Sequence, residues 1–125
     1  ISESDCRARF PKCGDRSGGT LQGLLGPTNA PCNGGFIRDG ATLAIIVLAN
    51  KDDSTFTSPP AWIADTQAAR PAESVAILTI TSNTPKISEF AAAFPATLTE
   101  TILAPTYTDA MKGFAALTLS SFCPP

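Results

Sequence analysis

Histidine is absent from this chain of 125 residues. A chain without imidazole groups cannot supply a Ser-His-Asp triad, a Cys-His pair, a histidine general base or a histidine metal ligand. Charge is also scarce, since charged residues make up 16% of the sequence and the net charge is −2. No basic patch therefore favours binding to nucleic acid or to an anionic membrane surface.

Long hydrophobic runs are missing too. No apolar run approaches the ~20 residues that a membrane-spanning helix needs, so we expect no membrane span. The sequence begins Ile1-Ser2-Glu3, without an initiator methionine or a signal peptide. We therefore expect a processed product or an excised fragment rather than an intact primary translation product.

The cysteines are few but even in number. Their spacing matches neither a C-x-x-C redox motif nor paired zinc knuckles. Two disulfide bonds in a protein that is secreted or displayed at the cell surface are the favoured interpretation, and reduced thiols in a cytosolic protein are the alternative. The sequence leaves the disulfide pairing open among Cys6, Cys13, Cys32 and Cys123.

One apolar stretch dominates what the chain does contain. Seven apolar residues run from Leu43 to Ala49, and polar and charged residues begin abruptly at Asn50. A strand with one wet face alternates polar and apolar residues, so this run predicts a strand that is buried on both faces. Such strands lie at the centre of parallel sheets, and ligands bind just past their carboxyl ends, where the segment 50–55 falls.

Later periodic segments predict the rest of the fold. We expect strands at Val75–Thr81 and Glu100–Ala104. Proline-led helices are expected from Ser58 to about Arg70 and from Asn83 to Pro95. A capping box of Thr106 and Asp109 predicts the start of a final helix that ends at Cys123. Its apolar stripe consists of Tyr107, Ala110, Met111, Phe114, Leu117 and Phe122.

The order strand-helix-strand-helix-strand-helix predicts an α/β fold, with a parallel sheet and helices on both faces as in Rossmann-like proteins. We assign this core to residues 41–125. Residues 1–40 form a Cys-, Gly- and Pro-rich irregular segment, which we expect to be stabilised by disulfides and packed on the core. A chain of this length holds both in a single domain.

Polar side chains follow the strand at 43–49. Asn50, Asp52 and Asp53, together with Ser54 and Thr55, offer the amide, carboxylate and hydroxyl oxygens that Mg²⁺ and Ca²⁺ prefer. We therefore assign a candidate hard-cation site to Asn50, Asp52 and Asp53, and no other cofactor is indicated. The alternative is a solvated loop whose side chains cap nearby backbone groups.

Other polar and aromatic candidates also have two explanations. Ser82–Thr84 follow the second strand and should lie at the same edge of the sheet, but capping of the next helix also explains them. Trp62 and Tyr107 are residue types that anchor partners at interfaces. Both lie on apolar faces of predicted helices, which favours core packing instead.

The segment Phe36-Ile-Arg-Asp-Gly leads into the apolar strand, and the acidic loop Asn50-Lys-Asp-Asp follows it. This stretch resembles bacterial secreted von Willebrand factor A-like domains, in which an N-x-G-F-L-R turn precedes a hydrophobic strand and a D-E-D-D loop. Tyr107-Thr-Asp-Ala-Met-Lys resembles the last helix of that group, which often closes on a cysteine. The similarity covers residues 33–123 as scattered motifs.

The resemblance implies a doubly wound sheet with a metal-dependent adhesion site at the strand ends. That site takes a D-x-S-x-S loop after the first strand, a threonine from another loop and an aspartate after the fourth strand. This chain has no D-x-S-x-S, and Asn50 stands where the family has an aspartate. The chain therefore resembles the C-terminal half of such a domain, with a degenerate adhesion site and without the first strands.

In the full fold of that family the strand at 43–49 lies beside the first strand, so here one of its sides would lack a partner. We expect residues 1–40 or a second polypeptide to cover that side. The expected function is extracellular and non-catalytic: protein binding, adhesion or self-assembly. One alternative is a small secreted hydrolase-like enzyme that pairs carboxylates such as Asp52 and Glu100. Another is a purely structural subunit of a surface assembly.

Overall fold

The computed structural model describes residues 37–38, 40–53 and 58–122, with side chains as far as Ser120. The expectations for the segment 1–36, for the cysteines and their pairing, and for Ser54 and Thr55 lie outside the described residues.

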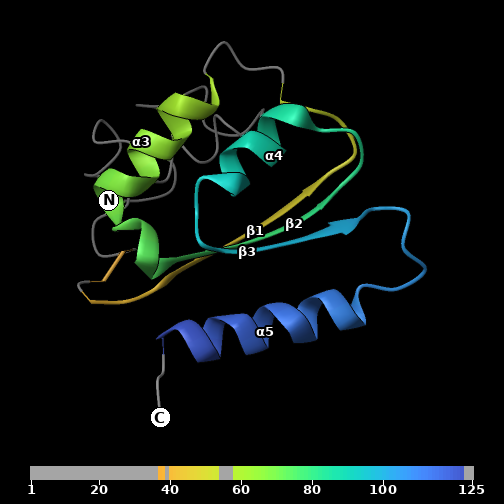
Figure 1. Cartoon of the computed structure of the whole chain (residues 1–125). Coiled ribbons are helices and arrows are strands. Elements are labelled where there is room, and N and C mark those ends of the chain that lie inside the picture. The colour runs from red at the N-terminus through yellow and green to blue at the C-terminus, as the bar shows by residue number, and fades with distance from the viewer. Residues whose placement is uncertain (1–36, 39, 54–57, 123–125) are drawn as a thin grey trace, which may run out of the picture.

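Three parallel strands form the sheet of the described chain (Figure 1). They are β1 (Leu43–Ala49), β2 (Val75–Thr81) and β3 (Ala96–Thr101), and their order across the sheet is β1-β2-β3. Leu43 pairs with Val75, and Ala76 pairs with Ala96, so the strands start at nearly the same level. Parallel neighbours need long crossover connections, and a helix provides each of them.

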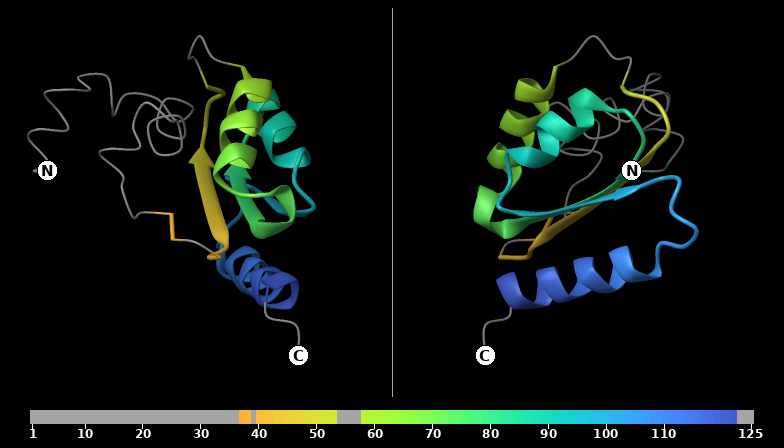
Figure 2. Two further views of the ribbon diagram at one scale, coloured as in Figure 1. Left: turned by 90° about the vertical axis from the view of Figure 1, so that its left-hand side faces the viewer. Right: turned by 45° about the vertical axis from the view of Figure 1, so that its right-hand side comes forward.

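Helices lie on both faces of this sheet. α3 (Pro59–Ala69) joins β1 to β2, α4 (Pro85–Ala92) joins β2 to β3, and α5 (Thr108–Phe122) follows β3. A short 3-10 turn, Ala72–Ser74, leads into β2. α3 and α4 pack on one face and α5 on the other, as Figure 1 and the turned views in Figure 2 show. The α/β fold with a parallel sheet and helices is therefore confirmed.

Proline residues set the starts of α3 and α4. Pro59 and Pro85 stand in the first helical turn, where a missing N–H removes no intrahelical bond. Arg70 ends α3, and its guanidinium donates from Nε to the Ala41 carbonyl at 2.9 Å and also to the Arg38 carbonyl. The same side chain therefore ends the helix and fixes the chain just before β1.

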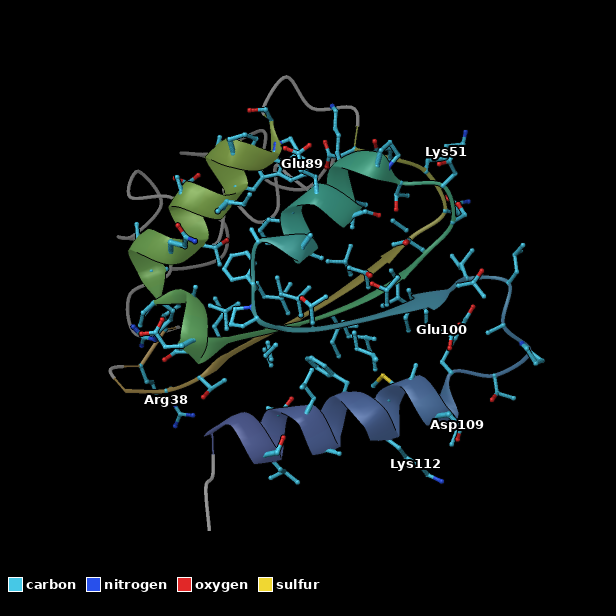
Figure 3. All side chains as sticks on the ribbon, viewed as in Figure 1. Arg38, Lys51, Glu89, Glu100, Asp109 and Lys112 are labelled. Carbon is cyan, nitrogen blue, oxygen red and sulfur yellow. The ribbon has the colours of Figure 1, made fainter. Side chains whose placement is uncertain are left out.

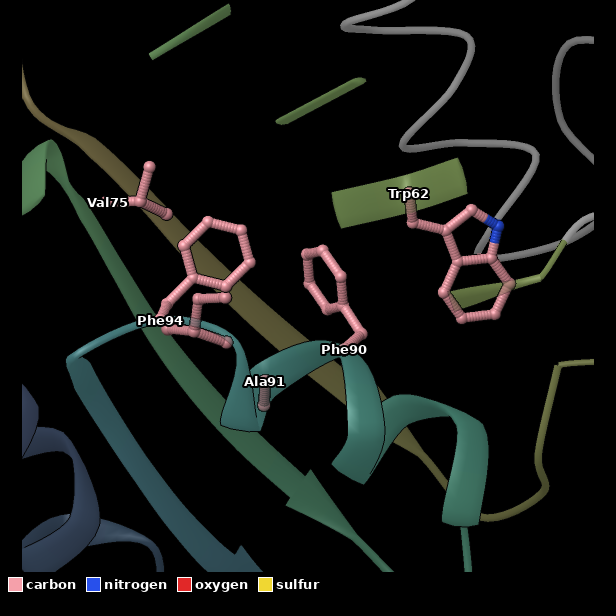
Figure 4. Packing of buried hydrophobic residues seen from close by; sticks show 6 residues of the cluster. Trp62, Val75, Phe90, Ala91 and Phe94 are labelled. Carbon is pink, nitrogen blue, oxygen red and sulfur yellow. The ribbon is translucent and has the colours of Figure 1, made fainter. Parts of the chain in front are cut away.

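Aromatic side chains fill the space between α3, α4 and the sheet (Figure 4). Trp62 is 2% exposed and meets Phe90 edge-on, with ring centroids 6.3 Å apart. Phe90 meets Phe94 in the same way at 5.4 Å. Edge contacts of this kind add about 0.5–1.5 kcal/mol per pair beyond the burial itself. The expectation that Trp62 packs in the core is confirmed.

α5 builds a second apolar cluster on the opposite face. Ala110 and Phe114 of this helix are buried against β2 and β3. Tyr107 is half-buried beside them and donates its hydroxyl to the Ile102 carbonyl at 2.7 Å. A Cβ on Gly113 would come within 3.2 Å of Leu98 Cδ2, so α5 lies close to β3. Tyr107 therefore belongs to this packed layer.

The prediction that the strand at 43–49 is central and buried on both faces is wrong for the described sheet. β2 holds the central place, and all seven of its residues are buried. In β1, half-buried residues alternate with exposed ones. The exposed face of β1 is the one on which α5 packs, but α5 covers β3 and β2 instead. An apolar strand is buried on both faces only where a helix covers each face.

Two predicted boundaries also differ. β3 begins at Ala96, directly after Pro95, rather than at Glu100, because Ala96 already pairs with Ala76. The last helix begins at Thr108, and Thr106 and Asp109 do not form the reciprocal side-chain bonds of a capping box.

Candidate functional site

The carboxyl ends of β1 and β2 lie side by side, and Ser82 ties them together. Its N–H donates to the Ala49 carbonyl at 3.3 Å, and its hydroxyl donates to the Asn50 carbonyl at 2.8 Å. Asn50 and Asn83 are both exposed at this edge. Parallel strands end at one edge of the sheet, so the two polar segments meet here as the sequence predicts.

Asp52 caps α4 from the neighbouring loop. Its Oδ2 atom accepts the backbone N–H of Lys86 at 3.1 Å, in the first turn of the helix. N–H groups of a first turn have no intrahelical partner, and the helix dipole favours a negative charge there. Thr84, at the N-cap position, makes no side-chain cap bond of its own, so Asp52 takes that role. The other oxygen of Asp52, Oδ1, is buried without a hydrogen-bond partner.

Lys86 places a positive charge in the same corner. Its ammonium donates to the Asp53 carbonyl at 2.9 Å, and Asp53 itself is buried. A hard cation bound here could use Asp52 Oδ1, but the ammonium of Lys86 would repel it. The described residues contain no group of three or more His, Cys, Asp or Glu side chains placed to hold a metal ion. The geometry fits a capped loop, and the assignment of Mg²⁺ or Ca²⁺ to Asn50, Asp52 and Asp53 stays a prediction.

The polar residues after β2 shape the turn into α4. Thr84 is buried, and its hydroxyl donates to the Ser82 carbonyl at 3.3 Å. The Ser88 hydroxyl donates to the Thr84 carbonyl at 3.0 Å. At the end of β3, the Glu100 carboxylate accepts the Thr101 N–H at 2.7 Å. Asp52 and Glu100, the carboxylates considered for catalysis, thus each bind a backbone N–H.

The outer strand β1 carries the second candidate site. Ala44, Ile46 and Leu48 lie on the face where α5 packs, and all three are exposed, Ile46 at 43% and Leu48 at 63%. We call these three residues the β1 stripe. Their register partners on β2 are buried in the cluster beneath α5. The β1 stripe therefore continues the apolar layer beyond the edge of the helix that covers it.

The backbone of the β1 stripe directs its hydrogen-bonding groups away from β2. The Ala49 carbonyl faces β2, because it accepts the Ser82 N–H. Backbone groups alternate along a strand, so the N–H and C=O of Ala44, Ile46 and Leu48 point away from β2. No strand of the described chain pairs with them. An apolar edge without Lys, Pro or a bulge is a template for a further strand.

α5 borders the β1 stripe with an apolar side chain. Gly113 faces Leu98 of β3, so the opposite flank of the helix turns toward β2 and β1. Met111 stands about 200° around the helix from Gly113, on that opposite flank. It is 44% exposed, although the sequence predicts it on the buried stripe. The apolar surface therefore extends from the strand to the helix.

The residues of β1 predict a central strand, and only the family resemblance implies that one side lacks a strand partner; neither predicts the exposed face. Both right-handed crossovers place α3 and α4 on one face, which leaves the other face to α5. A helix about 10 Å wide covers about two strands that are ~4.8 Å apart. The sequence therefore contained evidence for the exposed face of β1. It leaves one helix for the face opposite α3 and α4, and one helix cannot cover three strands.

Comparisons with protein-family models, with curated proteins and with solved structures return no match to this chain. Among the helices that the structure describes, none combines the length and the apolar character that a bilayer crossing requires.

Proposed function

We propose that this chain is a non-catalytic protein-binding module of the von Willebrand factor A-like type, secreted or displayed at the cell surface. In this proposal it takes a strand of a protein partner at the outer side of β1. One observation carries it: the outward backbone groups of Ile46 and Leu48 pair with no strand of the described residues, and the side chains of both residues are exposed. Strand addition uses both features, since main-chain bonds give affinity and side-chain contacts give specificity.

The polar groups at the strand ends support a non-catalytic role. Asp52 and Glu100 accept backbone N–H groups, and Lys86 holds the loop after β1 against α4. These bonds stabilise turns and helix starts. The family type is supported by the sequence motifs around β1 and by the parallel sheet, in which no described strand pairs with β1 on the side where the family has its first strand.

Hydrogen exchange at single amides tests this function. The outward amides of Ala44, Ile46 and Leu48 should exchange much faster than the inward amides of Ile45 and Val47, which bond to β2. A peptide with the sequence of residues 43–49 between paired lysines serves as the probe strand. Adding this peptide should slow exchange at the outward amides and leave the inward amides unchanged.

Two results would contradict the proposed function. The outward amides could already be slow in the protein alone, to the same extent at every protein concentration, which would mean that the chain itself occupies the edge. Alternatively, saturating peptide could leave them fast. The Ile46→Pro variant is the control, because it lacks the central outward N–H and should bind the probe more weakly.

A further inference from the structure

We infer that the partner strand is β1 of a second copy of this chain, paired antiparallel about a two-fold axis that passes beside Ile46. This inference rests on the proposed function and names the partner for the same edge. Its basis is that β1 is complementary to itself in one register. Closed two-fold pairs of this kind are the commonest form of oligomer.

The register follows from the directions of the backbone groups. Full overlap of two β1 strands sets Ile46 opposite Ile46 of the second copy and Ala44 opposite Leu48. All of these residues direct N–H and C=O outward, so each facing pair exchanges both of its bonds, as hydrogen-bonded antiparallel pairs do. Every outward group of the β1 stripe is then satisfied by an identical segment. A shift in register would leave outward groups of the stripe beyond the end of the partner's β1.

The side chains also fit this register. The large Leu48, 63% exposed, lies opposite the small Ala44, and the two Ile46 side chains meet at the axis. Facing residues in such a pair have Cβ atoms about 4.5–5.5 Å apart, close enough for direct apolar contact. No charged residue lies within β1, so no like charges face each other along the strand. Arg38 and Lys51 flank the strand at its two ends (Figure 3).

The size of this contact sets the expected affinity. At about 3.3 Å per residue, the edge is about 23 Å long, and one paired edge is small beside a standard interface of about 1,600 Å². We therefore expect monomer and dimer to exchange, with the dimer fraction rising with protein concentration. Contacts at the flanks, including Met111, would add to the paired strands.

Substitutions that place a charge at residue 46, beside the two-fold axis, test this register. Ile46→Lys and Ile46→Glu each place two like charges opposite each other and should keep the protein monomeric at concentrations where the wild type is largely dimeric. An equimolar mixture of the two variants should regain the dimer, because opposite charges then face each other. Leu119→Lys is the matched control: Leu119 is also exposed and apolar, at 62%, and it should leave dimerisation unchanged. Analytical ultracentrifugation over a concentration series gives the masses.

The mixture also shows that both variants are folded, since unfolded variants could not restore the dimer. A second measurement places the axis independently. Mixed labelled and unlabelled wild-type protein should give isotope-filtered NOEs between the Hα atoms of Ile45 and Val47, which face each other as a non-hydrogen-bonded pair.

The outcomes separate this inference from the proposed function. A wild-type protein that stays monomeric, or an Ile46→Lys variant that dimerises like the wild type, overturns the inference. A mixture that stays monomeric while the wild type dimerises also overturns it, provided that each variant has the circular dichroism spectrum of the folded wild type. In each case, protection of the outward amides by the probe peptide still decides whether the edge accepts a strand from another protein.

Discussion

The two outer strands of the described sheet differ in the side chains that accompany their outward backbone groups. On β3, the Ile102 N–H that follows the strand bonds to Thr81 of β2, so the Thr101 N–H points outward. The Glu100 side chain accepts that N–H at 2.7 Å, and the neighbouring outward residues are threonines. Within β1 all seven side chains are apolar, so none of them can accept an outward N–H. Its exposed positions are Ala44, Ile46 and Leu48, and no strand of the described chain pairs with its outward groups.

This difference distinguishes a polar outer strand, β3, from an apolar outer strand, β1. Native sheets protect an outer strand with charges, prolines, bulges or covering elements, because an unprotected edge pairs with other chains. On β3, Glu100 accepts the outward N–H of Thr101, whereas the described strand β1 is apolar and contains no charged side chain, proline or bulge. Within the described sheet, the outer strand β3 therefore has a charged side chain at its edge, and the outer strand β1 is apolar throughout.

The largest expected change in stability comes from a proline substitution on the inward side of β1, compared with one on the outward side. Ile45→Pro removes an N–H that bonds to β2 and leaves a β2 carbonyl unpaired, so we expect a loss of at least about 1–3 kcal/mol in unfolding free energy. Ile46→Pro removes only an outward N–H, which an edge strand tolerates, so stability should change far less. Urea denaturation followed by circular dichroism measures both.

The two proline variants act as controls for each other. Equal losses of stability would mean that the outer side of β1 is also paired in the monomer. That result would remove the contrast between β1 and β3.

A smaller loss of stability is expected at the carboxyl end of β1, where Asp52 binds the first turn of α4. Asp52→Ala removes the cap of α4 and should lower the free energy of unfolding by about 1 kcal/mol. Asp52→Asn keeps a neutral acceptor for the Lys86 N–H and should lose less. Thermal unfolding of wild type and both variants, with and without Mg²⁺ or Ca²⁺, measures the cap and tests the candidate cation site together.

A gain in stability in Asp52→Ala would contradict the cap, because it would mean that burial of the unpartnered Oδ1 atom outweighs the bond to Lys86. A rise in melting temperature with Ca²⁺ or Mg²⁺ that is lost in Asp52→Asn would instead support the cation site of Asn50, Asp52 and Asp53.

The smallest expected change in stability is on β3, where Glu100 accepts an outward N–H. Glu100→Ala frees the Thr101 N–H and should change stability by no more than about 0.5–1.5 kcal/mol, the net worth of one hydrogen bond. Light scattering should then show slightly more self-association than in the wild type. Glu100→Gln keeps an acceptor and is the matched control. Loss of self-association in Glu100→Ala would mean that β3, not β1, forms the interface.

Local sequence features determined most of the elements. Pro59 and Pro85 fixed the starts of two helices, and the buried strand Val75–Thr81 has the limits that its apolar run predicts. Ile87, Phe90, Ala91 and Phe94 are buried, and their i, i+3, i+4, i+7 spacing is that of one helix face. These features succeed because helix starts and amphipathic faces depend on residues a few positions apart. The Glu100–Ala104 strand was misplaced because the threonine-rich segment from Ala96 carries little apolar signal.

The sequence by itself determined that residues 43–49 form an apolar strand and that polar groups follow it. Only the tertiary structure decided that this strand lies at an edge of the described sheet, that α5 covers its neighbours instead, and that Asp52 caps α4. The physical reason is that an apolar composition favours burial of a strand, whereas the number and placement of the helices decide which strands are buried on both faces. β2 and β1 are both strongly apolar, and one is buried on both faces while the other keeps an exposed face.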